Sequence, residues 1–267
     1  MLHAQDISVS YGAKTILHQV ELHAKPGQLT AIVGPNGSGK TTLLKAITGE
    51  AQHSGTVLLN ERDVNTMQAW ELAAQRGVLS QATTLAFPFT VIEVVRIGLR
   101  SGTSGDVDRL AMQALARVSL SHYANRFYQE LSGGEQQRAQ LARVLAQVWE
   151  PVLEGQPRWL LLDEPVASLD IGHQLEVMDI AKTYARSGGG VIAVMHDLNL
   201  TALYADAVTI LSGGRVKAQG SPADVLTDPI LSDAYGCTLR VNVAPDPTVP
   251  YILPHAASTA SDRKVAS

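Results

Sequence analysis

The sequence predicts an α/β fold built on a mixed β-sheet with flanking helices. Three largely apolar runs of strand length support this prediction: Leu29–Val33, residues 158–163 and residues 191–195. Strands that are covered on both faces have near-continuous apolar sequences of this kind. Helical periodicity accompanies these runs, near residues 174–186 for example, and such alternation is typical of a layered α/β protein.

The N-terminal residues predict an antiparallel β-subdomain. Apolar and polar residues alternate around Ile7 and Val9, and again over residues 20–24, as in strands with one buried face. Pro26-Gly27 marks a turn before the first buried strand. Further short strands are expected at residues 57–59 and 78–80.

Residues 82–150 predict a helical subdomain inserted in the α/β core. Helical patterns cover Val91–Leu99 and residues 107–118, the second with apolar residues at helix spacing. The Ser/Gly-rich residues 101–105 between them indicate a flexible loop. Another helix is expected to follow the glycine pair at residues 133–134.

The C-terminal part predicts a β-hairpin and two short helices. The hairpin covers residues 208–219, with a turn at residues 212–214. Ser221-Pro222 and Asp228-Pro229 each read as a helix N-cap followed by proline at the first helical position. We therefore expect one domain over residues 1–254 and a flexible tail over residues 255–267.

The composition limits the class of protein. The 267 residues carry a formal charge of −4, which argues against a nucleic-acid binder led by electrostatics. A single cysteine, Cys237, excludes an intrachain disulfide, fits a reducing compartment and is expected to be a small buried or half-buried side chain. The sequence has no secretory signal pattern and no apolar stretch near the length of a membrane span.

The strongest motif follows the first buried strand. Residues 34–41 fit the phosphate-binding pattern G-x-x-x-x-G-K-[ST] and open a helix predicted at residues 41–48, with Gly49 after its end. Backbone N–H groups and the positive end of the helix dipole then surround a phosphate, while Lys40 reaches the outer phosphates and Thr41 offers its hydroxyl to Mg²⁺. The candidate nucleotide-binding residues are Gly34, Pro35, Asn36, Gly37, Ser38, Gly39, Lys40, Thr41 and Thr42.

An acidic pair ends the buried strand at residues 158–163. A carboxylate at this position, Asp163, is well placed to hold Mg²⁺. The next residue, Glu164, is a candidate general base for an attacking water. Taken alone, such a pair is more often a solvated strand end, and the phosphate loop favours the functional interpretation.

A second glycine motif precedes a long helical pattern. It reads Leu131-Ser132-Gly133-Gly134-Glu135, with Ser132 at or near the N-cap. The exposed N–H groups of such a helix start can bind an anion. Taken alone, the segment is more often an ordinary capped helix.

The two motifs together resemble the ATP-binding subunit of an ABC transporter, whose core is that of a P-loop NTPase. Residues 131–135 match the LSGG(Q/E) signature, and the similarity covers about residues 2–240. The resemblance implies that Tyr11 stacks on adenine, that Gln81 contacts Mg²⁺ and the attacking water, and that His196 contacts the γ-phosphate. It also implies a D-loop at residues 168–170. The further residues that it implies at the nucleotide are Ser132, Gly133, Gly134, Glu135 and Asp170.

The resemblance also implies an assembly and cofactors. Two copies pair head to tail, so that the signature segment of one covers the ATP and Mg²⁺ held by the phosphate loop of the other. Two transmembrane permease subunits carry the pair at the cytoplasmic face of a bacterial inner membrane, and a periplasmic substrate-binding protein acts indirectly. Residues 87–89 are candidates to line the groove that receives the permease, with plain packing as the alternative.

The longer path over residues 149–157 and the segment 227–236 resemble haem-import ATPases of the iron-chelate and vitamin B12 importer group. Import of a ferric siderophore or cobalamin stays open as an alternative. A non-transport ABC ATPase is a second class, although such proteins usually carry two cassettes or a long coiled-coil insertion. A simple P-loop kinase is disfavoured by the signature segment together with Gln81 and His196.

Overall fold

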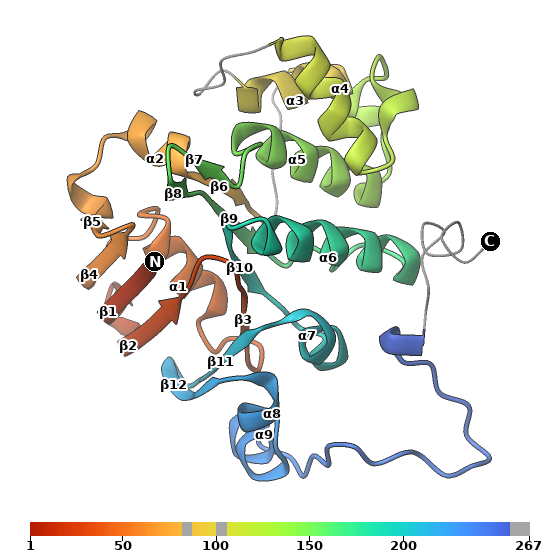
Figure 1. Cartoon of the computed structure of the whole chain (residues 1–267). Helices are drawn as coiled ribbons and strands as arrows, with labels where there is room; N and C mark the ends of the chain where they lie inside the picture. The colour runs from red at the N-terminus through yellow and green to blue at the C-terminus, as the bar shows by residue number, and fades with distance from the viewer. Residues whose placement is uncertain (82–86, 100–105, 257–267) are drawn as a thin grey trace.

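A six-stranded sheet runs through the centre of the computed structural model, which describes residues 1–81, 87–99 and 106–256 (Figure 1). The strand order is β12-β11-β3-β10-β9-β6, with β12 antiparallel to β11 at one edge and the other neighbours parallel. The strands are β3 (Leu29–Val33), β6 (Arg76–Leu79), β9 (Trp159–Asp163), β10 (Gly190–Val194), β11 (Ala207–Ser212) and β12 (Arg215–Gly220). The predicted mixed sheet is confirmed.

The central strands are buried on both faces. In β9, Leu160 and Leu162 join the larger apolar core, whereas Trp159 and Leu161 join the smaller one on the other face. Successive strand residues point to opposite faces, so a strand between two cores needs apolar residues at every position. This requirement explains the continuous apolar runs in the sequence.

A second, antiparallel sheet forms the predicted N-terminal subdomain. Its order is β2-β1-β4-β5, with β1 (Leu2–Tyr11), β2 (Lys14–Ala24), β4 (Ser54–Leu59) and β5 (Arg62–Asp63). Helix α1 (Lys40–Ile47) contacts β1 and β2 on one side and β9 and β10 on the other, within the smaller core. The short helix α2 (Ala69–Gln75), after a 3₁₀ turn at Val64–Thr66, leads into β6.

Along the chain, three helices in the described residues separate β6 from β9, as the sequence predicts. They are α3 (Val91–Leu99), α4 (Val107–Arg117) and α5 (Gly133–Gln147), with 3₁₀ turns at Ser121–Tyr123 and Tyr128–Glu130. They pack on one another at the top of Figure 1 and belong to the larger core. The loop predicted at residues 101–105 lies outside the described residues. The longer path before β9 contains a small hairpin of β7 (Val152–Leu153) and β8 (Gln156–Pro157).

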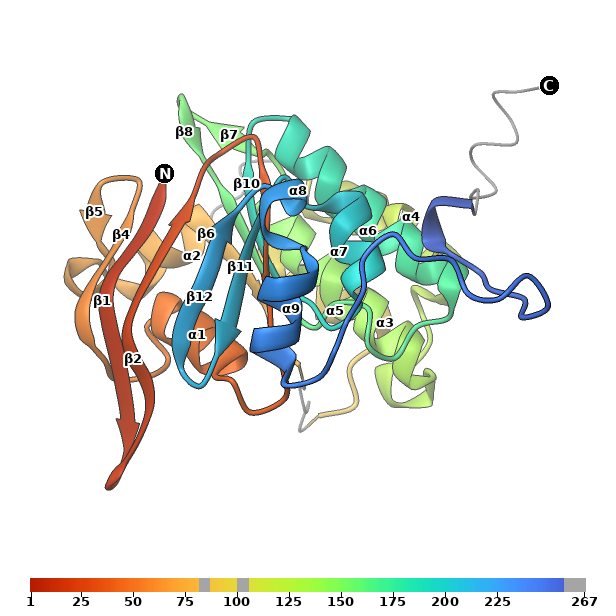
Figure 2. The ribbon, with the colours of Figure 1, turned by 90° about the horizontal axis from the view of Figure 1, so that it is seen from below.

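Of the remaining described helices, two follow the central strands β9 and β10, and two follow the edge strand β12. They are α6 (Ile171–Arg186), α7 (Leu198–Tyr204), α8 (Pro222–Val225) and α9 (Asp228–Tyr235). A long segment then runs from α9 to a 3₁₀ turn, Pro254–Ala256, which contacts α7 (Figure 2). Most of the predicted tail, residues 257–267, lies outside the described residues.

Two predictions about the C-terminal part are wrong in detail. Ser221 caps α8 as expected, but the N-cap of α9 is Thr227 and not Asp228, which is the first helical residue. The Asp228 carboxylate accepts a hydrogen bond from the Val241 N–H at 2.7 Å, so it holds the segment beyond the helix instead of capping its start. The expectation that Cys237 is buried or half-buried is also wrong: the residue is exposed, just beyond Gly236, whose left-handed φ of 69° ends α9.

A buried arginine ties helix α1 to the start of β6. Arg76 is 9% exposed, and its guanidinium donates to the carbonyls of Ile47 at 3.2 Å and Thr48. These carbonyls lie at the C-terminal end of α1, where backbone carbonyls have no partner within the helix. Burial lowers the pKa of Arg76, with the Glu50 carboxylate acting in the opposite direction.

We expect Arg76→Met to lower the free energy of unfolding by about 1–3 kcal/mol, because it leaves two buried carbonyls without donors. Urea denaturation measures the change. The matched control is Arg215→Met at the exposed start of β12, for which we expect a change within about 0.5 kcal/mol. Equal effects of the two substitutions would contradict the assigned role of Arg76.

Candidate functional site

The predicted phosphate loop joins the carboxyl end of β3 to the start of α1. Gly34, Gly37 and Gly39 have φ values of 148°, 76° and 103°, a region that favours glycine. A Cβ at Gly34 would lie 1.9 Å from the Leu211 carbonyl oxygen. The loop therefore needs glycine for its backbone angles and, at Gly34, also for space.

Lys40, the first residue of α1, reaches back to the start of this loop. Its Nζ donates to the carbonyl oxygens of Gly34 at 2.9 Å and Pro35 at 3.1 Å. Burial lowers the pKa of Lys40, whereas the carboxylates of Glu164 and Asp163 act to raise it. A cation held in this way can meet a phosphate oxygen without a large rearrangement.

A pocket of about 680 Å³ opens over the loop. This volume lies within the range of small-molecule and cofactor sites. The pocket brings together predicted residues from five parts of the chain and adds two that the sequence analysis missed, Lys14 and Ile16. Lys14 is the register partner of Tyr11 across the β1–β2 turn, so pairing of the predicted strands was the available signal. The predicted residues in the lining are Tyr11, Asn36, Gly37, Gly39, Lys40, Thr41, Thr42, Gln81, Glu164 and His196.

Glu164 joins two of these side chains at the edge of the pocket. Its Oε1 lies 2.6 Å from His196 Nε2, and its Oε2 accepts from Gln81 Nε2 at 2.9 Å. Glu164 has a φ of 52°, and a non-glycine residue in this left-handed region is uncommon. Its N–H donates to the Val194 carbonyl at 3.2 Å, which holds the chain in this conformation just beyond β9.

A further contact links Glu164 to helix α5. Gln137 Nε2 donates to the Glu164 carbonyl oxygen at 2.9 Å. Gln137 was not predicted, because neither its type nor its spacing distinguishes it from other polar residues of α5. The contact places the first turns of α5 directly against the residue that follows β9.

The two predicted metal ligands from the loop and the strand lie next to each other. The Thr41 hydroxyl donates to Asp163 Oδ1 at 3.1 Å, and both residues also line a smaller neighbouring pocket with Gln81. Burial raises the pKa of Asp163, while the hydrogen bond from Thr41 opposes this shift. A hydroxyl and a carboxylate oxygen are ligands that suit Mg²⁺, so the residues fit this ion.

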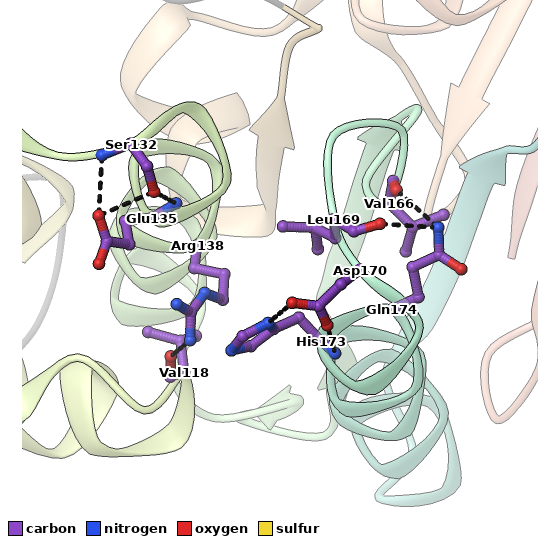
Figure 3. Close-up of polar contacts among 9 residues, drawn as sticks. All are labelled: Val118, Ser132, Glu135, Arg138, Val166, Leu169, Asp170, His173 and Gln174. Carbon is purple, nitrogen blue, oxygen red and sulfur yellow. Dashed lines mark hydrogen bonds and ion pairs between the residues drawn. The ribbon is translucent and has the colours of Figure 1, made fainter. Parts of the chain in front are cut away.

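The second glycine motif begins helix α5 with a capping box. The Glu135 N–H donates to Ser132 Oγ at 3.4 Å, and the Ser132 N–H donates to Glu135 Oε2 at 2.8 Å (Figure 3). The prediction of Ser132 as N-cap is confirmed. The spacing of serine and glutamate is itself the sequence signal for this box.

The helix starts of α5 and α6 face each other across a separate pocket of about 470 Å³, away from the phosphate loop (Figure 3). Asp170 is the N-cap of α6, where it accepts from the His173 N–H at 3.0 Å and pairs with His173 Nδ1 at 2.8 Å. Two residues of this lining, Arg138 and His173, were not predicted. The lining residues are Ser132, Gly133, Gly134, Glu135, Arg138, Ser168, Leu169, Asp170 and His173.

The pocket over the phosphate loop and the pocket between the starts of α5 and α6, called the first and second pockets below, share no lining residue. The predicted nucleotide-binding residues are therefore divided into two groups within one chain. Tyr11, the phosphate loop, Gln81, Glu164 and His196 belong to the first group, whereas the signature segment and Asp170 belong to the second.

Residues 17–167 match the family described as ABC transporter. The chain belongs to the ABC transporter family. It is 62% identical over 257 residues to the "Hemin import ATP-binding protein HmuV" of Jannaschia sp. (strain CCS1), which covers 96% of this chain and 95% of that relative. It is likewise 62% identical to the protein of that name from Roseobacter denitrificans, over 96% of this chain and 98% of the relative.

Solved structures of ABC cassettes share the fold. A nucleotide-free ATP-binding cassette from an ABC transporter superposes with a TM-score of 0.75 at 25% identity, covering 88% of this chain and 98% of that one. The dimeric post-hydrolysis state of the cassette MJ0796, bound to ADP and Pi, gives a TM-score of 0.72 at 26% identity over 83% and 99% of the two chains. The predicted P-loop NTPase fold and the predicted family of this ABC cassette are confirmed.

Within the described part of the chain, every helix of this cassette is too short or too polar to cross a membrane.

The aromatic residues after Gln81 divide into two kinds. Phe87 is 67% exposed, whereas Phe89 packs against the larger core, and the two rings meet edge to face at 6.2 Å. The exposed Phe87 and Pro88 remain candidates for contact with a partner, whereas the partly buried Phe89 favours the packing alternative.

Proposed function

We propose that this chain is the ATP-hydrolysing subunit of an ABC importer. The observation that carries the proposal is the carboxylate of Glu164, held between His196 and Gln81 at the edge of the pocket over the phosphate loop. A carboxylate in this position accepts a proton from a water that attacks the γ-phosphate. His196 and Lys40 stabilise the charge that develops on the phosphate oxygens.

The same proposal assigns the remaining residues of the first pocket. Tyr11, 55% exposed at the end of β1, offers its ring to the adenine base. The loop from Gly34 to Gly39 and the start of α1 bind the phosphates through backbone N–H groups. Thr41, Asp163 and Gln81 hold Mg²⁺, which neutralises phosphate charge when it is bound.

We propose that the second pocket acts on the nucleotide of another copy. The signature residues and Asp170 do not reach the first pocket of their own chain, so a head-to-tail pair is required to bring both groups to one ATP. The γ-phosphate then meets two helix starts at once, α1 of one chain and α5 of its partner. Its loss on hydrolysis removes the contact that favours the closed pair.

The proposed cargo is haem. Support comes from the two relatives described as hemin import ATP-binding proteins, each 62% identical to this chain. In this proposal two permease subunits hold the homodimer at the cytoplasmic face of the bacterial inner membrane, and a periplasmic binding protein delivers the cargo. Ferric siderophore and cobalamin are the alternative cargoes.

Reconstitution tests this function. The chain is co-expressed with its neighbouring genes, and any complex with a permease that co-purifies is placed in lipid nanodiscs. We expect ATP hydrolysis to rise several-fold when the periplasmic binding protein carries haemin, and to rise less with the same protein alone. If a ferric siderophore or cobalamin with its own binding protein stimulates hydrolysis instead, that compound and not haem is the cargo. Failure to associate with any permease would contradict a role in transport.

A further inference from the structure

Two histidines and a glutamate lie together on the outer face of the antiparallel sheet. His3 of β1 and His23 of β2 are direct register partners, and Glu21 lies two residues before His23 on the same face of β2. The flanking residues Leu2 and Leu22 point into the smaller core. Since strand side chains alternate between faces, the three polar side chains project outward together. None of them lines either pocket described above.

The three side chains lie at ligand distance from one another. The imidazole rings of His3 and His23 stack with centroids 3.9 Å apart and an interplanar angle of 25°. His3 Nε2 lies 3.4 Å from Glu21 Oε2. One ligand atom from each of the three residues lies within 4.8 Å of the other two. Elsewhere in the described residues, no three His, Cys, Asp or Glu side chains meet this criterion.

The backbone holds this cluster in place. Glu21 Oε1 accepts a hydrogen bond from the Asp6 N–H at 3.1 Å, which leaves Oε2 facing His3. The carbonyl of His23 accepts from Gln219 Nε2 at 3.1 Å, which joins β2 to β12 of the central sheet. These two hydrogen bonds restrict the Glu21 side chain and the backbone at His23. The ligand atoms therefore start from a partly organised arrangement.

We propose that His3, Glu21 and His23 form a site for a borderline divalent transition metal ion, of which Zn²⁺ is the representative probe. Two imidazole nitrogens and one carboxylate oxygen, with water in the fourth position, make a tetrahedral ligand set. Ligand atoms in such a set lie about 3.3 Å apart, given metal–ligand bonds of about 2.0–2.1 Å. The site differs from the Thr41–Asp163 pair, whose oxygen ligands suit Mg²⁺.

Binding at this site stabilises the N-terminal subdomain. The ion connects β1 to β2 across the sheet, and an ion that binds only the folded chain raises the melting temperature by mass action. Tyr11 and Lys14 lie at the other end of the same strand pair and line the first pocket. The metal site and the proposed nucleotide site therefore share one structural element.

Calorimetric titration of the full chain tests the site. The affinity tag is removed first, and millimolar Mg²⁺ occupies the oxygen-ligand site during the titration. We expect one Zn²⁺ per chain with a micromolar dissociation constant, and at least about tenfold weaker binding for His3→Gln and for His23→Gln. Glu21→Gln weakens binding too, because it removes the anionic ligand. Co²⁺ supplies a second readout, since four-coordinate Co²⁺ absorbs strongly in the visible range.

Two control variants identify the site that binds. His122→Gln removes an exposed imidazole of the helical subdomain, and we expect unchanged Zn²⁺ affinity. His196→Ala removes the imidazole of the first pocket, and we expect the micromolar affinity to persist. Circular dichroism confirms folding of each variant. Absence of binding up to about 1 mM Zn²⁺, or equal affinity in the wild type and the His3→Gln/His23→Gln double variant, would overturn the proposal and leave the cluster as a stacked cross-strand pair.

Discussion

Glu164→Gln is expected to lower ATP hydrolysis by the assembled complex by about 10²–10⁴-fold while ATP binding is retained. The amide has the shape of the carboxylate and can still contact Gln81 and His196, which lie 2.9 Å and 2.6 Å from the two carboxylate oxygens. It cannot accept a proton from water. ATP then accumulates uncleaved between two chains, so the variant forms a stable dimer with ATP. Phosphate release and size-exclusion chromatography measure the two effects.

The control for this substitution is Glu130→Gln. Glu130 is an exposed carboxylate of the helical subdomain that lies 3.7 Å from Arg126 Nε and lines neither pocket. We expect its hydrolysis rate to match the wild type. A Glu164→Gln variant that turns over at the wild-type rate would contradict the role of Glu164 as the base.

Gly133→Asp is expected to lower hydrolysis by at least about 10²-fold and to leave nucleotide binding by the single chain within about twofold. Apart from its chain neighbours and the backbone of its own helix, no atom lies within 4 Å of a Cβ built at Gly133, so the monomer leaves open space at this position. An aspartate in the first turn of α5 also interacts favourably with the helix dipole, which favours folding. In the dimer, the same carboxylate repels the γ-phosphate held by the other chain.

Gly155→Asp is the matched control. Gly155 lies in the β7–β8 turn with a φ of 76°, where an added Cβ has free space but the left-handed backbone costs an aspartate some strain, so circular dichroism checks that the variant folds. It adds the same charge outside both pockets and should leave hydrolysis unchanged. Nucleotide affinity of the isolated chain is measured by calorimetry. If Gly133→Asp abolishes binding in the isolated chain, the glycine pair has a local folding role and the shared site is wrong.

Some features were predictable because they depend on local backbone chemistry. Gly34, Gly37 and Gly39 occupy left-handed angles that few other residues adopt, so their pattern identifies the loop. Ser132 and Glu135 have the spacing of a capping box, so the helix start was visible as well. The error at Asp228 has the opposite cause, since its side chain bonds to Val241, which no local pattern reveals.

The resemblance to a family assigned roles to Gln81 and His196, but periodicity and spacing alone did not connect them to Glu164. They lie 83 and 32 residues from Glu164 along the chain. Gln81 follows β6, Glu164 follows β9 and His196 follows β10, and these three strands are adjacent and parallel in the central sheet. Their carboxyl ends therefore meet at one edge. Gln137 reaches the same edge from α5.

The sequence by itself determined the buried strands, the phosphate loop and the capped helix starts, because periodicity and backbone angles are properties of neighbouring residues. Only the tertiary structure decided which side chains meet. The order of the parallel strands gathers the pocket around Glu164, and the helix starts at Ser132 and Asp170 are left facing a different pocket. The pairing of His3 with His23 likewise depends on the register of β1 and β2, which is set by packing of both strands against the core.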